Sequence, residues 1–66
     1  MTGLQLEKAL NEVLRDYHKS DDKNAIIIKD TIVSWYYTTL ITDEKCVELL
    51  VNFCTTGTMN LQGCFN

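Results

Sequence analysis

The feature that most limits how this chain can fold is an apolar segment in its middle, from Ala25 to Ile41. Eleven of its seventeen residues are apolar or aromatic, and neither glycine nor proline interrupts it. Spread around a helix or over both faces of a strand, this much apolar surface needs cover on most sides. A chain of 66 residues supplies little cover, since a domain of this size buries only about 60% of the surface that its unfolded chain exposes. We therefore expect apolar surface to be left over for a partner.

The segment before it has the pattern of an amphipathic helix. Thr2 and Gln5 fit a capping box, in which the threonine hydroxyl accepts from the amide three residues on and the glutamine side chain bonds back to the cap amide. Apolar residues then recur at helical spacing, at Leu6, Leu10, Val13 and Tyr17. The sequence predicts a helix over about residues 2–19, followed by a polar linker over residues 20–24.

The middle segment itself has two interpretations. Thirteen of the seventeen residues from Ile26 to Thr42 are β-branched or aromatic, a composition that favours a strand. Spacing favours a helix, because apolar and aromatic positions follow steps of four, three and four and no Asn-Gly or Asp-Gly turn divides the run into a hairpin. We prefer a helix over residues 24–40, and an α+β fold with residues 26–41 as a strand is the alternative.

The third segment begins with clear helix signals. Thr42 is a good N-cap residue, and Asp43 and Glu44 bring negative charge to the first turn. Gly57 can adopt the left-handed conformation that ends a helix. These signals predict a helix over residues 42–56 and an irregular tail over residues 58–66. The expected fold class is all-α, a small three-helix bundle that forms one domain over residues 1–66.

Charge and cysteine content limit the class of function. The net charge of −3 falls entirely within residues 30–66, whereas residues 1–29 carry five charges of each sign. Nucleic acids and anionic membranes both select a basic surface, so we expect neither as a partner. No run of 18 or more predominantly apolar residues, which a membrane span needs, occurs in the sequence. Three cysteines are an odd number, and no apolar signal-peptide segment comes before them, which favours a reducing, cytoplasmic location.

Residues that could carry catalysis or hold a metal ion are few. His18 is the one histidine, and it falls at the end of the predicted first helix, where a solvated cation is the simple interpretation. The three cysteines, Cys46, Cys54 and Cys64, lack the Cys-x-x-Cys pair that is typical of a structural zinc site. We therefore expect no enzymatic activity, no cofactor, no metal and no small-molecule substrate.

The aromatic residues of the middle segment indicate an interaction surface. Consecutive residues on a helix point about 100° apart, so Trp35, Tyr36 and Tyr37 cannot all enter one core. Tryptophan and tyrosine are enriched among the residues that dominate protein interfaces. With Trp35 and Ile28 assigned to the core, the candidate partner-binding residues are Ile26, Val33, Tyr36, Tyr37 and Leu40.

From these observations we predict that the protein is a small acidic, non-enzymatic protein–protein interaction module. The simplest way to cover the remaining apolar surface is a homodimer that pairs two copies of the middle segment. Docking on a larger protein, as an adaptor or inhibitor, would cover it equally well. The alternative from another class is a helix-turn-helix-like DNA-binding regulator of transcription, although its recognition helix would begin with Asp43 and Glu44, which repel phosphate.

Overall fold

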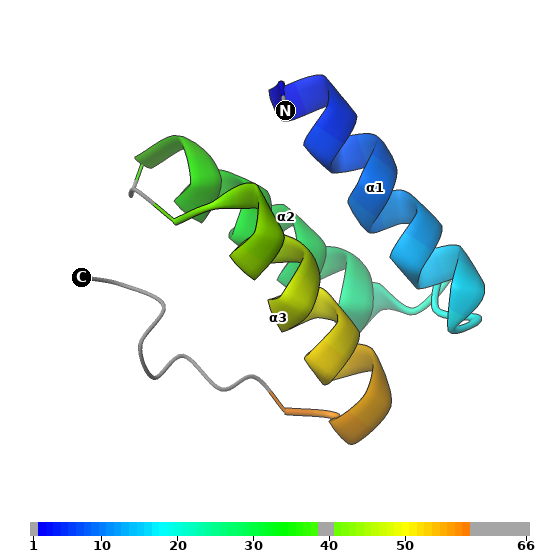
Figure 1. Cartoon of the computed structure of the whole chain (residues 1–66). Coiled ribbons are helices and arrows are strands. Elements are labelled where there is room, and N and C mark those ends of the chain that lie inside the picture. Colours follow the sequence, from blue (N-terminus) through cyan, green and yellow to red (C-terminus); the bar gives the residue numbers. More distant parts are fainter. Residues whose placement is uncertain (1, 39–40, 59–66) are drawn as a thin grey trace.

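The computed structural model describes residues 2–38 and 41–58, and these form three α-helices without a strand among them. The helices are α1 (Gly3–Asp16), α2 (Lys23–Thr38) and α3 (Asp43–Thr56). α1 and α3 run in one direction and α2 in the other (Figure 1), and each helix packs against both of the others. The predicted all-α three-helix bundle is confirmed. The alternative that made a strand of residues 26–41 is wrong, since α2 is one continuous helix.

All three helices begin at capping residues. The capping box of α1 is present: the Gln5 amide donates to Thr2 Oγ1 at 3.2 Å, and the Thr2 amide donates to Gln5 Oε1 at 3.0 Å. Asp22 caps α2, because its carboxylate accepts from the Ala25 amide at 3.0 Å. Thr42 caps α3 by accepting from the Lys45 amide at 3.2 Å. Each cap satisfies an amide that has no partner within its helix.

The end of α1 differs from the prediction, because the helix stops at Asp16 rather than near Lys19. The backbone of His18 is left-handed, with φ of 58°. The Lys19 amide donates to the Leu14 carbonyl at 2.7 Å, and the His18 amide donates to the Arg15 carbonyl at 3.1 Å. This pair of bonds is a Schellman motif, which closes a helix by turning the chain away. Glycine usually takes the left-handed position, so a histidine there gave no signal in the sequence.

The core lies where the three helices meet, and it consists of apolar residues from all of them. They are Leu6, Leu10 and Leu14 of α1, Ala25 and Ile32 of α2, Cys46, Leu49 and Leu50 of α3, and Ile41 just before α3. α2 contributes only one large side chain to this buried set, although it is the most apolar segment. Ile28 and Trp35, assigned to the core from the sequence, are half-buried and pack against it.

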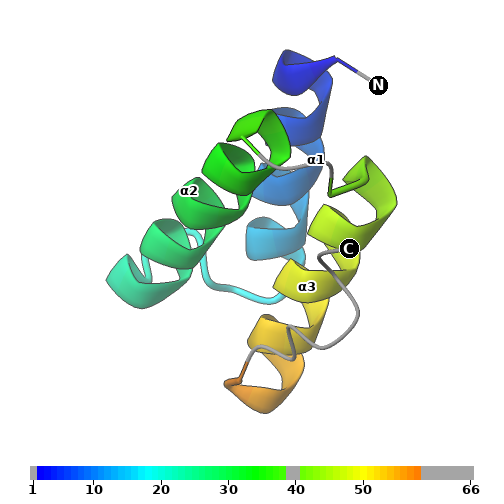
Figure 2. The ribbon, with the colours of Figure 1, turned by 90° about the vertical axis from the view of Figure 1, so that its left-hand side faces the viewer.

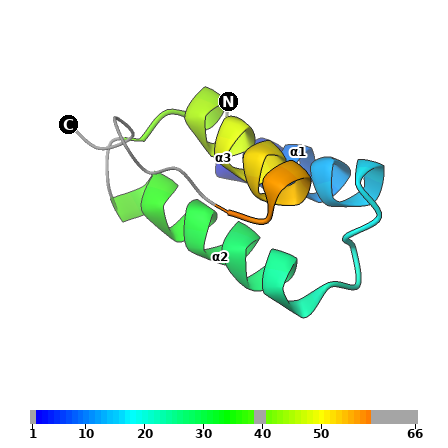
Figure 3. The same ribbon diagram turned by 90° about the horizontal axis from the view of Figure 1, so that it is seen from below.

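The three helices lie around one common core (Figures 2 and 3), and each contacts the other two. One side of α2 therefore faces α1, and a neighbouring side faces α3. None of the described helices combines the length and the apolar composition needed to cross a lipid bilayer. Thr58 follows α3 without helical structure, while Leu40 and residues 59–66 of the predicted tail lie outside the described residues.

Candidate functional site: the α1-facing side of α2

Three of the residues predicted to bind a partner share one side of α2. Ile26, Val33 and Tyr37 are separated by seven and four positions, so helical rotation brings them within about 40° of one another. Ile26, Val33 and Tyr36 are half-buried and pack against the core of their own chain, whereas Tyr37 is 66% exposed. The last member of the predicted set, Leu40, lies outside the described residues.

This side of α2 faces α1 along its length. Near the C-terminal end of α2, the hydroxyl of Tyr37 lies against Gly3, the first residue of α1. Near the N-terminal end, Ile26 and Lys29 line a hollow together with residues of α1. The predicted residues therefore do not form a separate surface on α2 alone. Ile26 and Tyr37 lie at the two ends of the line where α2 meets α1, and we refer to this line as the α1–α2 groove.

Tyr37 is held in place from two directions. Its ring meets the ring of Tyr36 edge to face, with centroids 5.6 Å apart and planes at 76°, and Tyr36 in turn packs against the core. On the other side, a β-carbon at Gly3 would overlap the Tyr37 hydroxyl, so the absence of a side chain at Gly3 makes room for the ring. An aromatic side chain fixed in this way has lost much of its rotational freedom before any partner arrives.

A second exposed apolar residue is the neighbour in sequence of the glycine that Tyr37 contacts. Leu4 follows Gly3 directly on α1, and its side chain is 67% exposed. We refer to Leu4 and Tyr37 as the apolar patch. Leu4 was not predicted from the sequence, although one signal was present: it falls outside the apolar stripe of Leu6, Leu10, Val13 and Tyr17.

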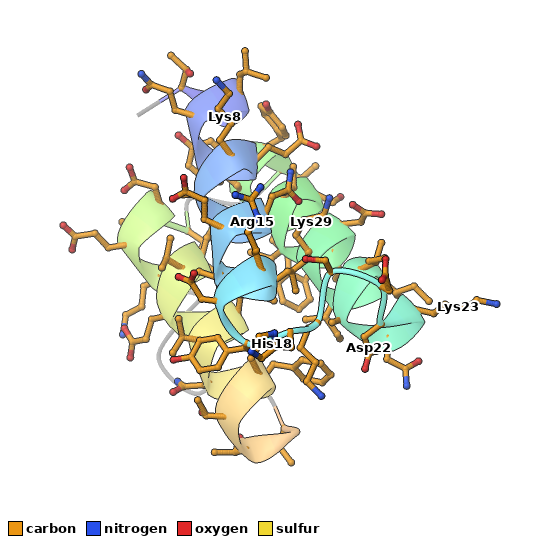
Figure 4. The ribbon with its side chains drawn as sticks, turned by 90° about the vertical axis from the view of Figure 1, so that its right-hand side faces the viewer. Lys8, Arg15, His18, Asp22, Lys23 and Lys29 are labelled. Atoms are coloured by element: carbon orange, nitrogen blue, oxygen red, sulfur yellow. The ribbon has the colours of Figure 1, made fainter. Side chains whose placement is uncertain are left out.

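The other end of the groove is hollow and carries positive charge. A pocket of about 370 Å³ is lined by Asn11, Leu14 and Arg15 of α1, Ser20 of the linker, and Ile26 and Lys29 of α2. Figure 4 views the bundle from this side and shows Arg15 and Lys29 close together between the two helices. The Lys29 ammonium lies 3.2 Å from the Asp30 carboxylate. Sequence analysis did not single out this pocket, because Arg15 and Lys29 are fourteen residues apart and look like ordinary surface cations.

The remaining chemically active side chains do not form a catalytic arrangement among the described residues. His18 is exposed in the turn after α1. Burial raises the pKa of the Cys54 thiol above its ordinary value of 9.0, against a smaller opposing effect of Lys19, so the thiol stays protonated and weakly nucleophilic near neutral pH. Within residues 2–38 and 41–58, no group of three or more His, Cys, Asp or Glu side chains is placed to hold a metal ion. Cys64 lies outside these residues.

The charges of α3 bear on the DNA-binding alternative. In a helix-turn-helix formed by α2 and α3, the first turn of α3 would approach the phosphates, and that turn carries Asp43 and Glu44. Lys45 is paired with Glu48 at 3.4 Å rather than held ready for a phosphate. This helix therefore presents the wrong sign of charge for a recognition helix.

Comparisons with protein-family profiles, with curated proteins and with solved structures find no match to this chain.

Proposed function

We propose that the protein is a non-enzymatic protein–protein interaction module that forms a homodimer through the apolar patch. This patch lies at the end of the α1–α2 groove where Tyr37 meets Gly3. The observation that carries the proposal is the apolar patch: Tyr37 is two-thirds exposed yet contacts Tyr36 and Gly3, and the exposed Leu4 directly follows Gly3 on α1. A reducing, cytoplasmic location belongs to the same proposal, because the odd number of cysteines does not suit a disulfide framework.

The exposed area of the patch sets the strength of the expected association. A tyrosine buries about 150–250 Å² when fully covered, so covering the exposed two-thirds of Tyr37 removes roughly 100–170 Å² from water. At about 25 cal/mol per Å², this contributes roughly 2.5–4 kcal/mol in each copy. Leu4 adds a smaller amount, and the loss of translational and rotational freedom opposes association by at least about 4 kcal/mol. We therefore expect a weak dimer that forms at micromolar to millimolar concentrations.

A second copy of the chain is the partner that suits this patch. Leu4 and Tyr37 carry no charge, so a two-fold axis through the patch would bring no like charges together there. The net charge of −3 is also too small to keep two copies apart at physiological ionic strength. A different protein that presents an apolar surface could bind the same apolar patch.

Sedimentation equilibrium tests the proposal. The wild-type protein should shift from monomer to dimer with rising concentration, and Tyr37→Ser and Leu4→Ser should each weaken that shift. Ile27→Ser is the matched control, because Ile27 is a large apolar residue of α2 with a similar exposure of 60% that points away from the core elsewhere on the helix. A wild-type protein that stays monomeric up to millimolar concentration would contradict self-association. Equal weakening by all three substitutions would show that the patch is not the contact.

A further inference from the structure

We propose that the pocket between α1 and α2 binds a small aliphatic carboxylate, with Arg15 and Lys29 holding the carboxylate group and Leu14 and Ile26 contacting the aliphatic part. This site lies at the opposite end of the groove from the apolar patch, and it does not depend on dimer formation. Its volume of about 370 Å³ falls at the lower end of the range for small-ligand sites, which suits a short-chain acid.

The first support is the convergence of two cations from different elements. Arg15 comes from α1 and Lys29 from α2, and both line the same hollow. No carboxylate among the described residues lies within ion-pair distance of Arg15, whereas Lys29 has Asp30. The Lys29 ammonium thus already has one carboxylate partner, and the exposed Arg15 guanidinium remains able to bind another. A planar guanidinium can donate two parallel hydrogen bonds to one carboxylate, which gives the site its preference for that group.

The second support is the position of Lys29. Lysine side chains usually extend their ammonium into water, but the side chain of Lys29 is only 12% exposed. Its counter-ion, Asp30, is 66% exposed and therefore screened by solvent. A ligand carboxylate in the pocket would give the ammonium a second acceptor. Both side chains can donate hydrogen bonds but cannot accept them. The pocket should therefore not bind a cation or a neutral ligand that has no acceptor atom.

The lining of the pocket also explains why the ligand should carry an aliphatic part. Leu14 is buried and Ile26 half-buried, and both give the lining apolar surface. Asn11 and Ser20 are exposed lining residues whose side chains can donate further hydrogen bonds to an oxyanion. A carboxylate on a short hydrocarbon chain satisfies both kinds of surface. Such a group occurs in a free short-chain acid and in the glutamate side chain of a partner protein.

Titration of the ¹⁵N-labelled protein with butyrate, followed by heteronuclear NMR, tests the site. We expect saturable shifts of the amides of Asn11, Arg15, Ser20 and Lys29 at millimolar butyrate. Butanamide is the matched control ligand, because it has the same chain without the charge, and it should cause no such shifts. Equal shifts with butanamide, or no saturation with butyrate, would overturn the proposal. Acetyl-glutamate amide distinguishes the two sources: binding tighter than butyrate indicates a partner's side chain, and weaker binding indicates a free acid.

Two matched variants show whether the pocket cations are responsible. Arg15→Gln removes the exposed pocket cation, and we expect it to weaken butyrate binding about tenfold. Lys23→Gln removes the same charge from the first residue of α2, where the side chain is exposed and directed away from the pocket (Figure 4), and binding should stay within about twofold of wild type. Circular dichroism confirms that both variants are folded. Equal weakening by the two substitutions would show a diffuse charge effect and would contradict a defined site.

Discussion

Two isoleucines of α2 allow the packing of this helix to be tested with one chemical change. Ile32 is fully buried, whereas Ile27 is 60% exposed, and alanine deletes the same atoms from both. Truncating a buried isoleucine to alanine costs about 2–5 kcal/mol through lost burial and the cavity that remains. The whole domain should be stable by only about 3–10 kcal/mol, at roughly 0.05–0.15 kcal/mol per residue. Ile32→Ala should therefore remove a large part of the stability, or leave the chain unfolded.

The matched change at Ile27 should behave in the opposite way. Little burial is lost there, and alanine is the better helix former by a few tenths of a kcal/mol, so Ile27→Ala should be neutral or slightly stabilising. Urea denaturation followed by far-ultraviolet circular dichroism, at a protein concentration low enough to keep the chain monomeric, gives both free energies of unfolding. The expected gap between the two variants is at least about 2 kcal/mol. A gap below about 0.5 kcal/mol, or a larger loss from Ile27→Ala, would refute the placement of α2 in the bundle.

Three further changes test local features of the fold. Thr42→Ala removes the hydroxyl that accepts from the Lys45 amide, and it should lower stability by about 1 kcal/mol and Tm by about 4–8 °C; an unchanged melting curve would contradict the cap. Gly57→Ala should cost about 1–2 kcal/mol in urea denaturation, because φ of 79° is unfavourable for a side chain; no atom lies near the new β-carbon, so a gain in stability would refute the backbone assignment. Burial raises the pKa of the Cys54 thiol, so the unfolded chain loses its proton at a lower pH than the folded one; stability should fall as pH rises through the alkaline range between the two pKa values, and Cys54→Ala should remove that part of the pH dependence.

The helix beginnings could be predicted from the sequence because each depends on residues a few positions apart. Thr2 with Gln5, and Thr42 with the acidic turn after it, act through bonds that close within one turn. The end of α3 at Gly57 is equally local, since only the backbone of one residue must turn left-handed. The end of α1 could not be predicted, because the left-handed position is taken by His18 and not by glycine, the residue that usually marks such an end.

The candidate site depends on contacts between residues that are far apart in the sequence, and no local sequence pattern predicts such contacts. Tyr37 was named from the sequence as a residue left over from the core, and the structure leaves it two-thirds exposed. Its contact with Gly3 spans most of the described chain and is set by how α1 and α2 cross. The same crossing brings Arg15 and Lys29 to one pocket. Residue types and spacing indicate which side of a helix is apolar, but they do not indicate which helix that side faces.

The most direct test of self-association is an isotope-filtered NOE experiment on a mixture of ¹³C-labelled and unlabelled chains. The filter retains only signals between protons of different copies. If the apolar patch joins two copies, the ring protons of Tyr37 in one copy should show NOEs to the methyl groups of Leu4 or to the ring of Tyr37 in the other. The proposal is contradicted if, at millimolar protein, the filtered spectrum contains no NOE from the Tyr37 ring, so that its only NOEs are the unfiltered ones within its own chain, as at Gly3 and Tyr36.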